Sequence, residues 1–292
     1  VVNPRIQEDI QAVNIAPEPI PAIPPGGPKA SEIYQNVQIL GDLDVGQFNR
    51  LMTAITAWVS PEQGCNYCHE AADLASDALY TKRVARVMIA MTQRANQDWQ
   101  AHVKDTGVTC YTCHRGQAVP AEVWATEPPP RMVKAMVPTG QNVAGVETVA
   151  YSSLPYDPLT PYLSEAKEIR VAADSALPED PGPTTKETEW TYALMMHLSN
   201  SLGVNCTHCH NSRAFRDWEQ SPDQRLQAWY AIRQVREMNN VFIDATTDIL
   251  PDSRKGPLGD PLKVNCKTCH QGVNKPLYGA PMLKDYPSLA TL

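Results

Sequence analysis

The chain has 292 residues, with 26 Pro and three Phe, so it is long enough for two medium domains but poor in the large apolar side chains of an ordinary core. Its formal net charge of -7 disfavours nucleic acid as a partner and favours basic proteins. No segment approaches the ~20 apolar residues that a membrane-spanning helix needs.

The chain opens with a Pro-rich stretch. Residues 1–30 end in PAIPPGGPKA, which predicts an extended N-terminal segment. A helix is then predicted in DVGQFNRLMTAITAWVSP, with Asp44 as N-cap, Gln47 at the capping-box position and Pro61 at its end. This helix leads into the sequence CNYCH at residues 65–69.

The longest helical pattern follows, because residues 70–106 contain neither Gly nor Pro. We predict a helix from Tyr80 to Val103, which carries Met88 and His102. The sequence CYTCH at residues 110–114 comes next.

Residues 120–183 are again rich in Pro and are predicted to be a connecting segment with few helical signals. The pattern then returns, because ETEWTYALMMHLSNSLG predicts a helix that ends at Gly203, and CTHCH follows at residues 206–210. A second helical stretch, AWYAIRQVREMNNVFI, precedes CKTCH at residues 266–270. Residues 280–292 are interpreted as a C-terminal tail.

The two halves of this pattern align with each other. Matching LMTAI to LMMHL pairs Met52 with Met195, and matching the second helices places Ile232 opposite Met88. We therefore predict a mainly α-helical fold with long irregular loops, built from two pseudo-symmetric halves that each contain two C-x-x-C-H sequences. The halves are residues 31–119 and 184–279.

All eight cysteines lie in the four C-x-x-C-H sequences. This run is the attachment signature of c-type haem, in which two thiols bond to one porphyrin and the histidine binds its iron. A zinc site needs four ligands around one metal, and neither a redox dithiol nor a disulfide framework requires a histidine behind every second cysteine. We therefore expect four covalently attached c-type haems, which would make each half a dihaem unit. The expected attachment residues are Cys65, Cys68, Cys110, Cys113, Cys206, Cys209, Cys266 and Cys269, and the expected proximal ligands are His69, His114, His210 and His270.

Haem attachment also predicts the compartment. The cysteine pairs have to survive reduced until haem arrives, which implies export and dedicated maturation. We therefore expect a periplasmic protein. No signal peptide or lipid-bearing cysteine stands at Val1, so we expect that any leader or N-terminal anchor lies outside this sequence.

Each iron needs a sixth ligand, usually a methionine thioether or a second histidine. Met52 and Met195 fit the first and third haems, because the helix before each motif can fold over the distal face of its porphyrin. On most helices such methionines would be core residues, but four irons without a sixth ligand favour ligation here. Met196 and His197 compete with Met195, although the repeat alignment disfavours both.

The helix predicted before the second haem can serve two irons. Met88 and His102 are about 21 Å apart along an ideal helix, so they cannot bind the same iron. The second half has Ile232 in place of Met88, so its fourth iron needs a ligand from elsewhere. His102 is the natural donor, which would give bis-histidine coordination, and Met238 remains a rival.

The stretches VSPEQGCNYCH, TGVTCYTCHRG, SLGVNCTHCHNSRAF and CKTCHQGVNKPLYGA, together with LKDYP, resemble the tetrahaem cytochrome c subunit of the purple-bacterial photosynthetic reaction centre. The resemblance runs from about Ser31 onward and is weak between Trp124 and Glu187. It implies four distal ligands at matching positions. These are Met52, Met88, Met195 and His102.

The resemblance implies an electron carrier, not an enzyme, on the periplasmic face of the photosynthetic membrane. Its partners would be the L and M (and H) subunits of the reaction centre. Four haems in a near-linear row would refill the photo-oxidised bacteriochlorophyll special pair from the third haem. A soluble cytochrome c or a high-potential iron–sulfur protein would supply electrons near the first.

Two other functions remain open at this stage. A multihaem reductase acting on nitrite or a related oxyanion would need one iron with an open distal position and nearby groups that handle protons. A free-standing periplasmic electron shuttle would carry the same haems without a membrane partner. Arg115 and Arg213, which follow the second and third motifs, are expected to pair with haem propionates.

Overall fold

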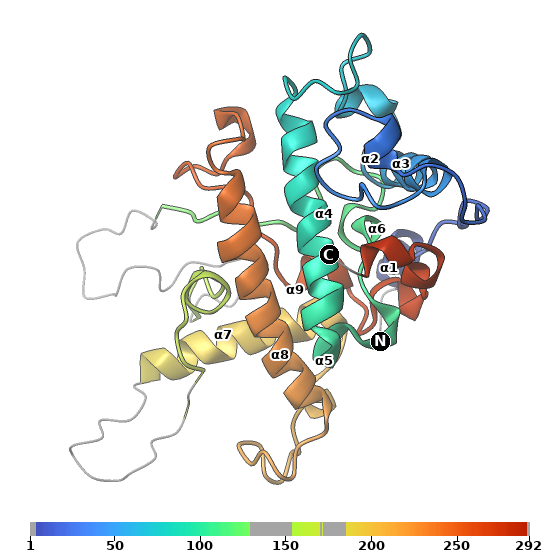
Figure 1. Ribbon diagram of the computed structural model, residues 1–292. Helices are drawn as coiled ribbons and strands as arrows, with labels where there is room; N and C mark the ends of the chain where they lie inside the picture. The colour runs from blue at the N-terminus through green and yellow to red at the C-terminus, as the bar shows by residue number, and fades with distance from the viewer. Residues whose placement is uncertain (1–3, 129–153, 170, 172–184, 291–292) are drawn as a thin grey trace.

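The computed structural model describes residues 4–128, 154–169, 171 and 185–290 (Figure 1). Within these ranges the chain is mainly helical with irregular loops, and its β-structure is limited to isolated bridges. The predicted fold class is confirmed at this level. The α-helices are α1 (Pro4–Val13), α2 (Ala30–Ile33), α3 (Val45–Val59), α4 (Tyr80–Asp98), α5 (Gln100–Val103), α6 (Cys110–His114), α7 (Thr185–Leu202), α8 (Gln224–Glu237) and α9 (Cys266–His270).

Shorter helical turns fill much of the remaining described chain. The 3-10 turns are η1 (Gly64–Tyr67), η2 (Lys104–Thr106), η4 (Cys206–His208), η6 (Asp244–Thr246), η7 (Asp252–Arg254), η8 (Pro276–Gly279), η9 (Met282–Asp285) and η10 (Pro287–Leu289). Two further segments, η3 (Thr160–Ser164) and η5 (Met238–Ile243), are π-helical.

Helix α3 begins and ends where the local signals predict. The Asp44 carboxylate accepts a hydrogen bond from the Gln47 backbone N–H at 2.9 Å, which satisfies one of the free N–H groups of the first turn. The helix ends at Val59, two residues before Pro61.

Helix α4 begins at Tyr80 as predicted but ends at Asp98, so the continuous helix expected up to Val103 is interrupted. The chain turns at Trp99, where φ is -109° and ψ is 29°, before α5 begins. Neither Gly nor Pro causes this break. The indole N–H of Trp99 donates to the carboxylate of Glu237, at the end of α8, and this long-range contact accompanies the turn.

Helix α7 ends at Gly203 as predicted, with φ of +65° there. A Cβ at this position would lie 2.1 Å from the carbonyl oxygen of Gly272, which follows α9. Glycine therefore serves both the left-handed turn and the close approach of two chain segments.

Figure 1 shows α4 at the centre of the molecule, with α8 alongside it and α7 crossing near the lower end of α8. Arg94 of α4 donates to Glu237 of α8 at 3.3 Å, and α7 contacts α9. A first core cluster packs α4, α7, α8 and η3 together. It consists of Met91, Ala95, Trp124, Leu159, Tyr162, Leu163, Leu194, Ile232, Val235, Met238, Ile243 and Val264.

A second core cluster surrounds α3 and includes the C-terminal segment. Residues 280–292 were expected to be a tail, but Gln93 and Asn96 of α4 donate to the carbonyls of Ser288 and Leu289 at 3.0 and 2.7 Å. The C-terminal segment therefore belongs to the packed body. The cluster consists of Leu51, Ala54, Trp58, Ile89, Cys110, Leu277, Met282, Tyr286 and Leu289.

The N-terminal segment differs from the extended chain that its proline content predicts. Residues Pro4–Val13 form helix α1, and Ile10 of this helix packs against Gly272, where a Cβ would meet it at 3.1 Å. Among residues 4–30, residues 14–29 lack regular helix. Apart from Pro4, the prolines of this segment all lie in residues 17–28, so residues 5–16 are free to form a helix.

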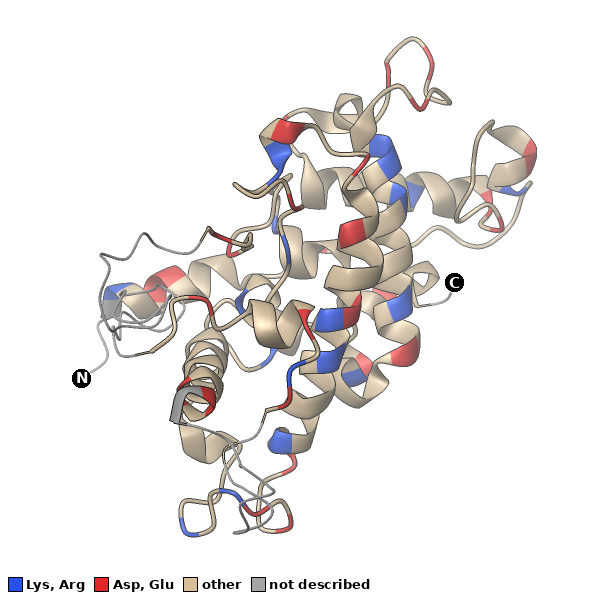
Figure 2. Ribbon diagram, turned by 90° about the vertical axis from the view of Figure 1, so that its left-hand side faces the viewer, with Lys and Arg blue, Asp and Glu red and all other residues tan. Residues whose placement is uncertain are grey.

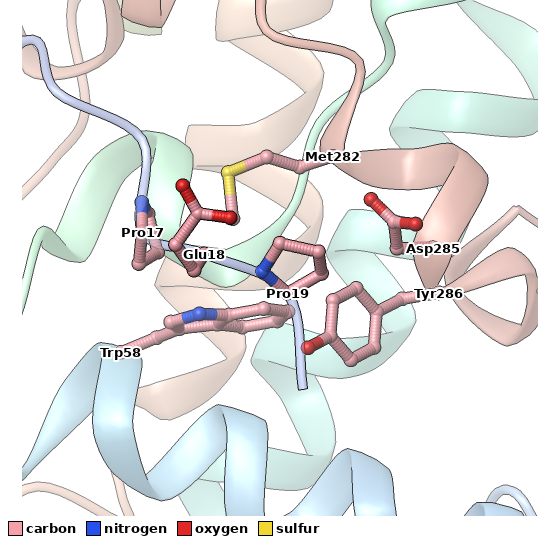
Figure 3. Close-up of a pocket in the computed structure, with 7 residues that line it drawn as sticks. All are labelled: Pro17, Glu18, Pro19, Trp58, Met282, Asp285 and Tyr286. Carbon is pink, nitrogen blue, oxygen red and sulfur yellow. The ribbon is translucent and has the colours of Figure 1, made fainter. Parts of the chain in front are cut away.

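The irregular part of the N-terminal segment crosses α3 and the C-terminal turns (Figure 3). Trp58 and Tyr286 meet edge to face with ring centres 4.6 Å apart, and residues 17–19 lie beside them. The cavity between these groups has a volume of about 10 Å³, which is room for one water molecule at most. This corner of the molecule is therefore closed.

The connecting segment is described only in part, and residues 129–153 and 172–184 lie outside the described residues. Its segment η3 enters the first core, where Tyr162 and Leu163 are fully buried. Arg236 of α8 donates to the Tyr162 carbonyl at 2.9 Å. The segment thus contributes to the core between α7 and α8.

The charged residues do not separate by sign. Figure 2 shows basic and acidic residues interspersed along the helices. Among the described residues, no helix is long and apolar enough to cross a membrane.

Candidate haem sites

The second and fourth C-x-x-C-H sequences each form one turn of α-helix, α6 and α9. Thr109 and Asn265 are the N-caps, and each backbone N–H bonds to the hydroxyl of a threonine three residues later, at 2.9 and 3.0 Å. The residue after each histidine is left-handed, with φ of 48° at Arg115 and 45° at Gln271. Local capping therefore presents two cysteines and one histidine from a single rigid turn.

The first and third sequences form 3-10 turns, η1 and η4. Cys65 and Cys206 are exposed, whereas Cys110 and Cys266 of the other two motifs are buried. The four motifs thus divide into an exposed pair and an internal pair.

All four motif histidines are oriented by the same kind of hydrogen bond. In the exposed pair, Nδ1 of His69 lies 2.9 Å from the Leu74 carbonyl oxygen, and Nδ1 of His210 lies 2.8 Å from the carbonyl of Phe215. Each acceptor is five residues after its histidine. The Nδ1–H donates to the carbonyl, so Nε2 is the nitrogen left to bind a metal.

In the internal pair the acceptor lies three residues after the histidine. Nδ1 of His114 is 2.8 Å from the carbonyl oxygen of Gln117, and Nδ1 of His270 is 2.9 Å from that of Val273. Burial lowers the pKa of both imidazoles, and the pKa of His270 falls to about 4, with the neighbouring His102 as a second cause. Both are therefore neutral at pH 7, as an iron ligand must be.

The structure brings the rings of His102 and His270 close together, although they are far apart in the sequence. Their ring centres are 6.1 Å apart and their planes are inclined by 29°. One metal bound between two imidazole nitrogens at ~2 Å from each requires ring centres roughly 6 Å apart. The distance between the two rings matches this requirement.

The orientation of His102 comes from a residue that the sequence analysis missed. Nδ1 of His102 lies 2.6 Å from Oε1 of Gln234, a side chain of α8 that is 3% exposed. The amide oxygen can only accept, so His102 is protonated at Nδ1 and Nε2 is free. Burial lowers the pKa of His102. No local pattern marks Gln234, because its partner is 132 residues away.

The candidate methionines lie on the helices where they were predicted. Met52 is half-buried on α3, beside the second core, and α3 contacts η1 of the first motif. Met88 and Met195 are half-buried against the first core, on α4 and α7. Helix α4 also contacts α6 of the second motif.

The rivals for these positions have other contacts. His197 is fully buried, and its Nε2 lies 3.3 Å from the hydroxyl of Ser201. Met238 belongs to the first core and is 7% exposed. Met196 is half-buried.

Arg115, which was expected to pair with a haem propionate, makes four contacts with protein oxygens in the structure. Its guanidinium donates to Cys269 O at 2.6 Å, to the Asn14 side-chain oxygen at 3.0 Å, to Thr112 O at 3.3 Å and to Val13 O. It therefore ties the second motif to the fourth and to the end of α1.

The thiols of the internal pair lie close together, with Cys113 Sγ 2.7 Å from Cys269 Sγ, so the two motifs are neighbours. Burial raises the pKa of the Cys110 thiol to about 12. A zinc site would need four ligands around one point, and the described part of the chain holds no group of three or more His, Cys, Asp or Glu residues so arranged. The eight cysteines are instead distributed over the four C-x-x-C-H turns, each with its own histidine.

Comparison with known proteins agrees with this arrangement. The sequence profile of the photosynthetic reaction centre cytochrome C subunit matches residues 1–290. The subunit of Thermochromatium tepidum is 58% identical over 272 residues, covering 93% of this chain and 67% of the relative. That of Rubrivivax gelatinosus is 48% identical over 99% of this chain and 79% of the relative, and that of Roseobacter denitrificans is 44% identical over 93% and 76%. The chain therefore belongs to the family of photosynthetic reaction centre cytochrome c subunits.

Proposed function

We propose that this electron-transfer subunit carries four c-type haems and passes electrons from a soluble periplasmic donor to the photo-oxidised bacteriochlorophyll special pair. The observation that carries this proposal is the pairing of His102 with His270, whose ring centres are 6.1 Å apart. His270 is buried and His102 is half-buried, and a protein oxygen holds Nδ1 of each ring at 2.9 and 2.6 Å, so Nε2 of each is the nitrogen that can bind a metal.

A bound c-type haem supplies one-electron exchange between Fe(II) and Fe(III). The protein's residues hold it and adjust its potential. In each motif two cysteines provide the thioether bonds and one histidine offers Nε2, while a backbone carbonyl holds Nδ1–H and keeps the ring in place.

The proposed distal ligands are Met52, Met88 and Met195 for the first three haems and His102 for the fourth. The contacts of α3 with η1 and of α4 with α6 support the first two assignments. For the third, Met195 occupies the repeat position of Met52. A thioether ligand raises the reduction potential relative to imidazole. The fourth haem, with His102 as its distal ligand, would therefore have a lower potential than a His/Met haem in the same surroundings.

Two pseudo-symmetric dihaem halves, residues 31–119 and 184–279, are part of this proposal. Their support comes from equivalent backbone contacts. Gly116, after the second motif, donates to the carbonyl of Trp58 at 2.8 Å, and Gly272, after the fourth, donates to that of Ser201 at 2.8 Å. Trp58 and Ser201 are paired when LMTAI is matched to LMMHL. Residues 120–183 would then connect the halves.

The proposed partners are the L and M (and H) subunits, with the protein on the periplasmic face of the photosynthetic membrane. The donor would be a soluble cytochrome c or a high-potential iron–sulfur protein that acts near the first haem. The family assignment supports association with the reaction centre.

The direct test is flash spectroscopy on membranes that contain this chain. We expect a flash to oxidise a haem of the subunit as the special pair is re-reduced, and the added soluble donor to restore it. A membrane in which the flash oxidises the special pair and no haem responds would contradict the proposal and would favour the shuttle or the reductase.

A further inference from the structure

Lys82 is almost completely enclosed in the first turn of α4, with 8% of its surface exposed. Its ammonium donates to three consecutive carbonyls of the loop after the first motif, Leu74, Ala75 and Ser76, at 2.9, 2.8 and 2.9 Å. Nζ also lies 3.4 Å from the carboxylate of Asp77. All three ammonium protons are thus directed into this loop.

One of these carbonyls has a second donor. The Leu74 oxygen accepts Nδ1–H of His69 at 2.9 Å and the ammonium of Lys82 at 2.9 Å. A carbonyl oxygen has two lone pairs, so both bonds form together. Four backbone carbonyls accept the Nδ1–H groups of the motif histidines. Among the hydrogen bonds of the described residues, a lysine donates to one of these four, the carbonyl of Leu74.

The shared carbonyl gives Lys82 a chemical effect on His69. A carboxylate that accepts a ligand histidine's N–H raises the basicity of the ring. A positive charge on the acceptor acts in the opposite sense, because it withdraws electron density and leaves a weaker partner for Nδ1–H. The imidazole then donates less to Fe(III), which raises the reduction potential.

We propose that Lys82 is a positioning residue that raises the reduction potential of the first haem by polarising the carbonyl that holds its proximal ligand, His69. The inference depends on the proposed attachment of haem at Cys65 and Cys68. It goes further by assigning the tuning of one iron to a residue outside the motif.

The position of Lys82 is unfavourable for a purely structural cation. Positive charge in the first turn of a helix opposes the helix dipole. The other half closes its loop differently. Arg225 of α8 donates to the Asp217 carbonyl at 2.9 Å and leaves the Phe215 carbonyl, which holds His210, to the histidine. The third motif is therefore an internal comparison in which a cation holds the loop without bonding to the carbonyl that holds the histidine, and acts on the ring only through space.

The test is a redox titration of the haem-loaded protein carrying Lys82→Met. We expect the potential of one haem to fall, with the one-electron equilibrium changing about threefold to tenfold, where tenfold corresponds to 59 mV. Lys82→Arg keeps the positive charge, so its potential should stay close to that of the wild type. Lys82→Gln keeps a neutral donor for the loop and should also lower the potential, which provides a second route if the methionine variant does not fold.

Arg86→Met is the matched control. Arg86 holds the same loop through Asp77, at 2.8 Å, and loses the same charge on substitution, but it does not contact the Leu74 carbonyl. An equal fall of potential in Arg86→Met, or an unchanged potential in both Lys82→Met and Lys82→Gln, would overturn the proposal.

Two further measurements separate this proposal from the assignment of the haems. The g-values of the affected low-spin haem in electron paramagnetic resonance should change in Lys82→Met and stay unchanged in Arg86→Met, because only the first alters the axial imidazole. The shifted haem should be the one whose potential responds to Met52→His. Peptide mass spectrometry of the wild type shows whether Cys65 and Cys68 carry haem. A peptide without haem at these positions would contradict the haem assignment itself, and with it the role of Lys82.

Discussion

Gln234 is expected to control both the position and the basicity of His102. Its side-chain oxygen accepts Nδ1–H of His102 at 2.6 Å from a position on α8 that is 3% exposed. Gln234→Leu keeps the volume but removes the acceptor. A buried donor left without a partner costs about 1–3 kcal/mol, so we expect the free energy of unfolding in urea to fall by about this amount.

The redox effect distinguishes this role from ordinary packing. Without an acceptor the imidazole of His102 is less basic, so Gln234→Leu should raise the potential of the fourth haem. Gln234→Glu should lower it, because a carboxylate acceptor makes the ring more basic. Burial raises the pKa of a carboxyl group, so the lowering in Gln234→Glu should be lost as the pH falls and the group is protonated. Each change is expected to be of the order of 59 mV, or tenfold in the one-electron equilibrium.

Gln93→Leu provides the control for these measurements. Gln93 is 5% exposed and donates to the Ser288 carbonyl at 3.0 Å, so its loss also removes one buried hydrogen bond. It should reduce stability without changing any potential. The reasoning would be refuted by shifts of the same sign in Gln234→Leu and Gln234→Glu, or by a comparable shift in Gln93→Leu.

Three further outcomes are expected. Arg115→Met should lower the free energy of unfolding by about 3 kcal/mol in a urea titration, because charged hydrogen bonds, such as the partly buried one to the Cys269 carbonyl, are worth about 1.5–3 kcal/mol each. A change below about 0.5 kcal/mol would mean that other contacts hold the two motifs together. Met52→His should lower the potential of one haem in a redox titration, since imidazole replaces a thioether, and four unchanged potentials would exclude Met52 as a ligand. The fully reduced protein should not bind carbon monoxide at neutral pH, because in the proposed scheme every iron would have two protein ligands, and uptake at one haem in the optical spectrum would favour the reductase alternative.

The sequence predicts best the features that depend on neighbouring residues. The start of α3 follows from the Asp44 carboxylate reaching the Gln47 N–H, and the end of α7 follows from the left-handed conformation of Gly203. The C-x-x-C-H motifs are equally local. Each motif of five residues is enough to predict the attachment chemistry, and its fourfold recurrence uses all eight cysteines.

Features that depend on distant residues could not be predicted. Helix α1 is held in place by Ile10, which packs against Gly272, and α4 breaks at Trp99, whose side chain donates to Glu237. The residues that orient the histidines belong to this class. Neither a lysine in the first turn of a helix nor a glutamine within one carries a pattern that marks it as the partner of a ligand.

The same long-range contacts make the two proposed halves depend on each other. In the proposed scheme the fourth motif, in the second half, takes its distal ligand His102 from the first half, and Gln234 of the second half orients that ligand. Arg115 of the first half binds the Cys269 carbonyl of the second. A half that supplied both of its own distal ligands would need none of these contacts. Ile232 stands where the alignment of the halves places Met88, so in the proposed scheme the fourth iron depends on a residue that only the other half provides. In that scheme the pairing of the halves would be a requirement of ligation as well as of packing.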